Sequence, residues 1–184
     1  MGRGIKQILE EARHESSNML DLDEQGLKEI PSELWEIQTL GRLNLSHNKI
    51  TDLPEDIARL SKLELLTIFN NKLDSLPKSI SSLPLLKIVT ARHLVLRDNK
   101  LVSLPKEIGK LKEIRFLLLQ GNRLTTLPKE LANTPLDSSG AKLRLAGNPL
   151  ASAIVDVLKR TGVPGLFALM RTEEYEKDVE NTIG

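Results

Sequence analysis

The chain has 184 residues, which is long enough for one domain with a continuous hydrophobic core. Its 26 lysines and arginines balance 25 aspartates and glutamates, and a net charge of +1 creates no strong field that would attract nucleic acid or an anionic membrane. The sequence has no cysteine, which excludes disulfides, thiolate nucleophiles and cysteine-based zinc sites, and no stretch reaches the roughly 20 apolar residues of a membrane helix. These features predict a cytoplasmic protein with no membrane span and no bound nucleic acid.

Residues 1–17 are expected to form an N-terminal capping helix. Apolar side chains recur there at helical spacing, at Ile5, Ile8, Leu9 and Ala12. Such an apolar face would cover the open end of a stacked structure. Acylation at Gly2 is a weaker alternative, because Lys6 stands where the usual myristoylation pattern has serine or threonine.

Residues 18–150 contain about six copies of one apolar pattern. The segments 40–62 and 63–85 align position for position as LxxLxLxxNxLxxLPxxIxxL, and Asn48 and Asn71 lie 23 residues apart. Two later copies repeat the pattern, and partial copies flank the set on both sides. The pattern resembles the leucine-rich-repeat superfamily. The expected fold is therefore α/β, a leucine-rich-repeat solenoid shaped as a curved right-handed horseshoe, with parallel concave strands and helical caps at both ends.

The spacing also supplies a physical reason for stacking. Leu43 and Leu45 alternate as in a strand and point to one face, so each copy carries apolar side chains that it cannot bury alone. Stacking would place Leu66 on Leu43 and Ile68 on Leu45, and stability becomes approximately a sum of contacts between neighbouring repeats. A proline after each second bend suits the first position of a short helical or irregular convex segment: Pro31, Pro54, Pro77, Pro105 and Pro128.

An asparagine recurs at the same position of five copies. The positions are Asn48, Asn71, Asn99, Asn122 and Asn148, and Gln25 takes the same place in the first partial copy. We expect these asparagines to form a structural ladder inside the solenoid. Their side-chain amides would hydrogen-bond backbone groups that the turn leaves unpaired.

The repeat is irregular at 86–98. Asn71 and Asn99 lie 28 residues apart, five more than the usual spacing. The surplus is either a loop on the convex side, where insertions are tolerated, or a junction at which whole repeats are missing. The second explanation is favoured, because both flanks of the segment read as parts of regular repeats. In either case the interface near Ala91 should be the weakest in the stack.

Residues 151–184 are expected to form a C-terminal helical cap and tail. Two helices would be separated at 161–163, with apolar faces carrying Val155, Leu158, Phe167 and Met170. An uncovered solenoid end would expose a large apolar patch, so a cap is favoured over a helix that binds a partner.

The residues between the inward leucines should project from the concave face. Several of them are apolar in the middle repeats, where a solvated face would carry polar groups, and such patches mark interfaces. The predicted partner-binding residues are Leu65, Phe69, His93, Val95, Arg97, Phe116, Leu118 and Gln120. Phe69 and Phe116 are the expected hot spots, and Ser46 is expected to project from the same row as Phe69.

Charged residues should orient a polar partner on this face. Acids gather at one end, at Asp21, Asp23 and Glu24, and the bases Lys142 and Arg144 lie at the other. Two alternatives stay open. The apolar side chains could lean on their neighbours, or the irregular segment could turn Val95 away from the face.

No catalytic or metal-binding pattern occurs in the sequence. His14, His47 and His93 are interpreted as isolated surface residues, because none belongs to a recognisable triad or a metal-spaced cluster, and no phosphate-binding glycine-rich loop is present. We therefore expect neither enzymatic activity nor a cofactor or metal.

The LPxxIxxL form of the repeat resembles the intracellular leucine-rich-repeat proteins of the Ras-related class. The segments that carry the resemblance are 45–54, 69–83, 96–114, 120–131 and 162–175. It implies an adaptor in Ras-linked signalling or at integrin adhesion sites, whose partner is a LIM-domain adaptor of the PINCH type or a Ras-pathway component. Direct regulation of a small GTPase, or a phosphatase-type regulator, is the alternative on the same face. We expect a monomer. The chain is shorter than this class by several repeats, which puts in doubt any partner that needs the full arc.

Overall fold

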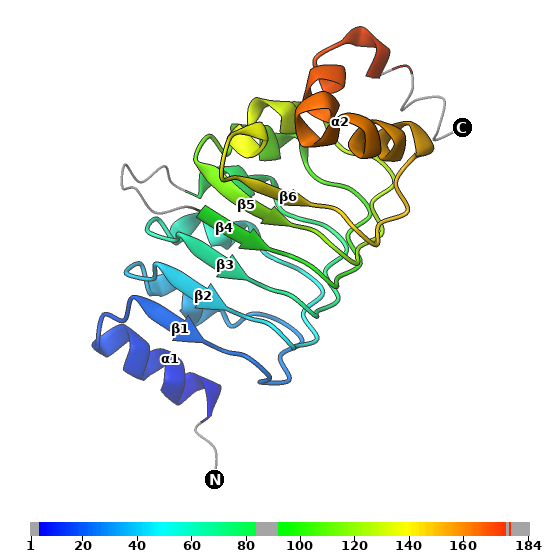
Figure 1. The fold of residues 1–184 in the computed structure, drawn as a ribbon. Helices are drawn as coiled ribbons and strands as arrows, with labels where there is room; N and C mark the ends of the chain where they lie inside the picture. Colours follow the sequence, from blue (N-terminus) through cyan, green and yellow to red (C-terminus); the bar gives the residue numbers. More distant parts are fainter. Residues whose placement is uncertain (1–3, 84–91, 176, 178–184) are drawn as a thin grey trace.

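The computed structural model describes residues 4–83, 92–175 and 177 (Figure 1). Within these residues, six parallel strands form one sheet in chain order. The strands are β1 (Met19–Asp21), β2 (Arg42–Asn44), β3 (Leu65–Thr67), β4 (Arg92–Val95), β5 (Ile114–Leu118) and β6 (Lys142–Arg144). The open sheet of stacked parallel strands confirms the predicted α/β solenoid.

The core is built from equivalent leucines stacked one above another. Leu43 is the register partner of Leu66, and Leu66 is the partner of Leu94. The full row is buried along the sheet: Leu20, Leu43, Leu66, Leu94, Leu117 and Leu143. A second buried row follows two positions later: Leu22, Leu45, Ile68, Leu96, Leu119 and Leu145. Each repeat thus buries its apolar ring only against its neighbours, as the spacing predicts.

Short 3₁₀ helices lie on the side of the solenoid opposite the strands (Figure 1). Five of them span Ser32–Glu36, Glu55–Arg59, Lys78–Ser82, Lys106–Lys110 and Lys129–Asn133, and a sixth 3₁₀ helix, Pro135–Asp137, follows in the chain before β6. A proline immediately precedes each of the five, one residue earlier than predicted. The physical reason is that the proline keeps an extended ψ while its carbonyl accepts the first helical bond, as Pro54 does from the Ile57 amide at 3.1 Å.

The stack continues across the irregular repeat. Residues 84–91 lie outside the described residues, and with them the predicted weak interface at Ala91. After these residues, β4 pairs with β3 in regular register, and His93 lies opposite Leu65. The register shifts between Arg92 and His93 against β5, so that one extra β5 residue is accommodated there. A cavity of about 30 Å³ lies in this region, lined by Leu63, Glu64, Leu66, Leu83, His93, Leu94, Leu111 and Ile114.

A helix covers each end of the stack (Figure 1). At the N-terminal end, α1 (Ile5–His14) buries Leu9 and Ala12 against the first repeat. At the C-terminal end, α2 (Ser152–Met170) is interrupted at Gly162, whose φ of 68° is left-handed, within the predicted break at 161–163. The cap buries Ile154, Leu166, Phe167 and Met170, whereas Val155 and Leu158 are only partly buried.

Tyr175 fastens the end of the cap. Its ring is buried, and its hydroxyl donates a hydrogen bond of 2.6 Å to the Leu127 carbonyl. Burial raises the pKa of the Tyr175 hydroxyl to about 12. Folding of the C-terminal end therefore favours the neutral form of this hydroxyl.

Candidate functional site

Three rows of side chains project from the strands between the buried leucines, and we call this surface the strand face. Register pairing places Arg42, Leu65, His93, Phe116 and Lys142 in the first row. The second row contains Asp21, Asn44, Thr67, Val95, Leu118 and Arg144. The third row, just beyond the strands, follows the same order from Asp23 through Ser46, Phe69, Arg97 and Gln120. Val95 keeps its place between Thr67 and Leu118, so the irregular segment does not turn it away.

Phe69 is held between two nitrogen-bearing side chains from neighbouring repeats. The ring of His47 meets it edge-on at 4.4 Å between centroids. The guanidinium of Arg97 lies over the ring at 4.5 Å from its centroid. The Arg97 contact uses the negative face of the Phe69 ring, and the T-shaped pair with His47 is a favoured arrangement of two rings, while Phe69 stays partly exposed.

Phe116 has a similar environment two strands further on. The ring of His93 stacks on it at 4.2 Å with an interplanar angle of 14°. Lys142 lies on the next strand, β6, and its ammonium is 5.8 Å from the centroid of the Phe116 ring. The two phenylalanines thus do lean on neighbours, but both stay partly exposed on the strand face.

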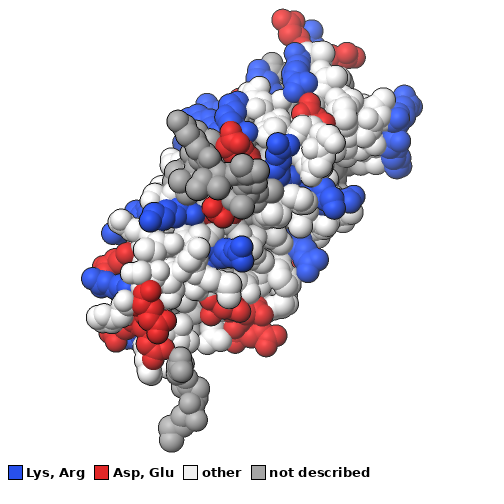
Figure 2. Space-filling view, turned by 60° about the vertical axis from the view of Figure 1, so that its left-hand side comes forward, with Lys and Arg blue, Asp and Glu red and all other residues white. Residues whose placement is uncertain are grey.

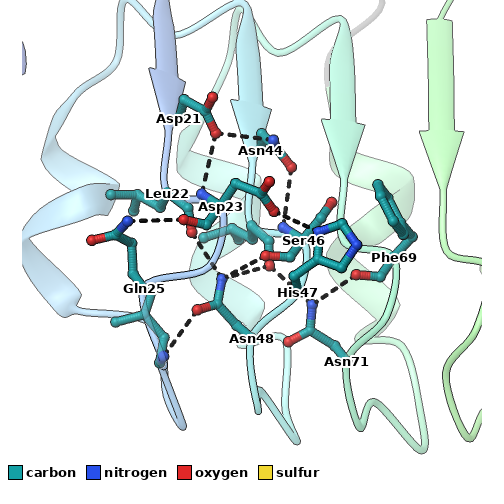
Figure 3. Close-up of polar contacts among 12 residues, drawn as sticks. Asp21, Leu22, Asp23, Gln25, Asn44, Ser46, His47, Asn48, Phe69 and Asn71 are labelled. Atoms are coloured by element: carbon teal, nitrogen blue, oxygen red, sulfur yellow. Dashed lines mark hydrogen bonds and ion pairs between the residues drawn. The ribbon is translucent and has the colours of Figure 1, made fainter.

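A polar network covers the N-terminal half of the strand face (Figure 3). The side-chain nitrogen of Asn44 donates a hydrogen bond of 2.9 Å to the Asp21 carboxylate. The side-chain oxygen of Asn44 accepts a hydrogen bond from the backbone N–H of Ser46. The Asp23 carboxylate lies 2.8 Å from Nδ1 of His47. Because a carboxylate only accepts, Nδ1 carries the proton in this pair. Two of the three acids predicted to face a partner, Asp21 and Asp23, therefore already have partners within the chain.

The interpretation of His47 as an isolated surface residue is wrong, because it bridges Asp23 and Phe69. The reason is a left-handed backbone at this position, with a φ of 51°, that recurs once per repeat at Glu24, Asn70 and Asp98. A sequence cue existed. The residue before each ladder asparagine is usually Asn, Asp or Gly, which adopt this conformation readily, so the repeat pattern predicts the same left-handed backbone at His47, a residue type that also tolerates it.

Two residues of the third row, Ser46 and Gln120, do not project freely into solvent. Ser46 is fully buried, and its hydroxyl has no hydrogen-bond partner among the described residues. Its predicted projection is wrong, because the short side chain does not reach past Asp23 and His47 beside it (Figure 3). Gln120 is partly buried, and its side-chain oxygen is likewise without a partner in the described part of the chain.

The ladder asparagines join each repeat to the one before it. Asn71 donates to the Leu45 carbonyl at 2.9 Å and accepts from the Ile50 amide at 3.0 Å. Asn48, Asn99, Asn122 and Asn148 make the equivalent pair of bonds one repeat apart. Gln25 follows α1 and not another repeat, and among the described residues its side chain bonds only the Asp23 carbonyl, at 2.8 Å. The ladder holds the turns that fix the third row in place.

Charge is unevenly spread along the solenoid. Figure 2 shows acidic side chains gathered at the N-terminal end and basic side chains more frequent above them. On the C-terminal half of the strand face, Arg97, Lys142 and Arg144 are all exposed. Within the described residues none of the three forms an ion pair or a side-chain hydrogen bond.

Comparison with known proteins places the chain among repeat proteins. The sequence profile described as "Leucine rich repeat" matches residues 18–73, and no curated protein sequence matches significantly. The structure of a leucine-rich-repeat protein of Leptospira interrogans is 29% identical to this chain with a TM-score of 0.53. The match covers 76% of this chain and 39% of the Leptospira chain. This chain therefore spans less than half the length of that protein.

Two structures from Arabidopsis thaliana match over more of their own length. A chain of the BIR3–SERK2 complex is 32% identical with a TM-score of 0.55, and the match covers 72% of this chain and 69% of that one. The BIR2 ectodomain is 26% identical with a TM-score of 0.56, over 72% of this chain and 68% of that one.

Metal sites and membrane-spanning helices are absent from the described residues. No group of three or more His, Asp or Glu side chains there could hold a metal ion, and no helix there is long and apolar enough to cross a bilayer. The repeat fold that the chain shares with its relatives generally mediates protein–protein interaction. By repeat pattern, profile match and structural similarity, the chain belongs to the leucine-rich-repeat family.

Proposed function

We propose that the chain is a protein-binding adaptor that holds its partner on the strand face. The observation that carries the proposal is the set of apolar side chains in the middle of that face. Leu65, Phe69, Val95, Phe116 and Leu118 are all partly exposed where a solvated strand would carry polar groups. Their fixed positions lower the entropy cost of binding, because the rings are ordered before a partner arrives.

The partner in this proposal is a LIM-domain adaptor of the PINCH type, and the chain acts in the cytoplasm at integrin adhesion sites. Support comes from the resemblance of segments such as FNNKLDSLPKSISSL at 69–83 to the Ras suppressor protein. In this role the chain works as a monomer without catalysis, cofactor or metal. Its binding residues are Leu65, Phe69, His93, Val95, Arg97, Phe116, Leu118 and Gln120.

Calorimetric titration with a purified LIM-domain protein of the PINCH type tests the proposal. The double variant Phe69→Ser with Phe116→Ser should bind at least about tenfold more weakly, because truncating aromatic hot spots costs 2 kcal/mol or more. Val102→Ser is the matched control, since Val102 is an exposed apolar residue outside the three rows. Its affinity should equal that of the unmodified chain.

Two results would contradict the proposal. One is an unchanged affinity in the double variant, and the other is no binding of the LIM-domain protein at all. A small GTPase, titrated in its GTP-bound and GDP-bound forms, tests the alternative partner on the same face. Binding of the GTPase in place of the LIM-domain protein would assign the chain to direct regulation.

A further inference from the structure

The two halves of the strand face differ in how their charges are used. In the N-terminal half, Asp21 and Asp23 are engaged by Asn44 and His47 within the chain. In the C-terminal half, Arg97, Lys142 and Arg144 are exposed, and no described residue forms an ion pair with them. The three cations are therefore available to a partner, whereas Asp21 and Asp23 already accept hydrogen bonds within the chain.

These cations surround an apolar centre. Val95 and Leu118 are register partners in the second row, and both are partly exposed. Arg97 lies beyond the carboxyl end of β4, whereas Lys142 and Arg144 lie on β6. Two strand spacings separate β4 from β6, so the cations are on the order of 10 Å apart across the sheet.

The basic side chains are also partly pre-positioned. Arg97 rests on Phe69 and Lys142 lies near Phe116. A cation held over a ring loses less conformational freedom when a carboxylate arrives than one that moves freely in solvent. Asp98 follows Arg97 and offsets part of the positive charge, which limits the attraction of polyanions in general.

The geometry points to an acidic protein surface as the occupant of the C-terminal half of the strand face, with carboxylates on Arg97, Lys142 and Arg144 and an apolar side chain on Val95 and Leu118. This inference rests on the proposed function and narrows the chemistry of its partner. A protein surface is favoured over nucleic acid, because the centre is aliphatic and the acids Asp21, Asp23 and Glu24 would repel a polyanion that extended along the face.

Methyl NMR spectra of the whole chain provide the test. The probe is a short synthetic peptide with one leucine flanked by glutamates, and its counterpart carries glutamine in place of each glutamate. The glutamate peptide should shift the Val95 and Leu118 methyl signals, and raised salt should reduce the shifts. The double variant Arg97→Glu with Arg144→Glu should lower the peptide affinity at least tenfold.

Arg42→Glu is the matched control, because Arg42 is an exposed cation of the first row in the N-terminal half. It should leave the glutamate-peptide titration unchanged. Four outcomes overturn the inference: equal shifts with the glutamine peptide, no shifts at Val95 and Leu118, an equal loss in Arg42→Glu, or stronger binding of a single-stranded oligonucleotide at the same methyls.

Failure of this inference can be told apart from failure of the proposed function. If the LIM-domain protein binds the Arg97→Glu, Arg144→Glu variant at full affinity, the charge assignment is wrong and the adaptor proposal survives. If the glutamate peptide binds as described and the LIM-domain protein does not, the acidic-surface inference survives and the assigned partner is wrong.

Discussion

The N-terminal and C-terminal halves of the strand face use the same backbone for different purposes. At the N-terminal end, polar side chains at equivalent positions of neighbouring repeats pair with one another, as Asp23 does with His47. At the C-terminal end, Arg97 and Lys142 lie against rings and keep their charge exposed. The difference indicates that repeat position alone does not decide whether a charged side chain is paired within the chain or stays exposed. What decides it is whether the adjacent repeat supplies a complementary group.

The largest expected effect concerns the scaffold that both halves share. Leu66→Ala should lower the free energy of unfolding by about 2–5 kcal/mol, because Leu66 is buried between Leu43 and Leu94. Urea denaturation measures the change. Leu65→Ala alters the adjacent, partly exposed residue and should cost much less. Equal losses in the two variants would mean that the strand face and the core are not distinct.

The next effect concerns the asparagine ladder, whose hydrogen bonds connect neighbouring repeats. Asn99→Ala should cost roughly 1–3 kcal/mol, because the Leu73 amide and the Ile68 carbonyl lose their partner in a buried region. Gln25→Ala removes the same ladder position where no earlier repeat exists and should cost far less. Thermal or urea unfolding of both variants compares them, and a large loss at Gln25 would show that the ladder does not act between repeats.

Alkaline pH should loosen the C-terminal end selectively. The pKa of Tyr175 is about 12 in the folded chain, above its ordinary value of 10, so folding favours the neutral hydroxyl. Its stabilising contribution is complete below pH 10 and is lost as the pH rises through 12. Melting curves of the unmodified chain and of Tyr175→Phe should therefore converge or cross in that window. Parallel curves would show that Tyr175 does not titrate there.

The smallest effect concerns the polar network of the N-terminal half. A double-mutant cycle with Asp23→Asn and His47→Asn should give a coupling of about 0.2–1 kcal/mol, because the pair is about one-third exposed. Asparagine at position 47 keeps a side chain that tolerates the left-handed backbone. Neither variant should change partner affinity. A loss of affinity would extend the binding surface into the N-terminal half.

The sequence by itself determined the repeat, the buried leucine rows, the rows of the strand face and the positions of the ladder asparagines. A fixed spacing brings equivalent residues into register whatever their neighbours are, so Leu43 must meet Leu66 and Arg97 must share a row with Gln120, each pair 23 residues apart. The period also carried Val95 onto the face despite the irregular segment, since β4 resumes the register of β3.

Only the tertiary structure decided which side chains on the face engage one another. Asp23 pairs with His47, and Arg97 lies over Phe69, so both contacts are made between different repeats. The burial of Ser46 is likewise decided by the fold. Such contacts depend on side-chain rotamers and on a left-handed turn at His47, which the apolar period does not encode. The anchoring of Tyr175 on Leu127 likewise depends on how the cap folds back over the last repeat, because periodicity fixes register only where the repeat continues.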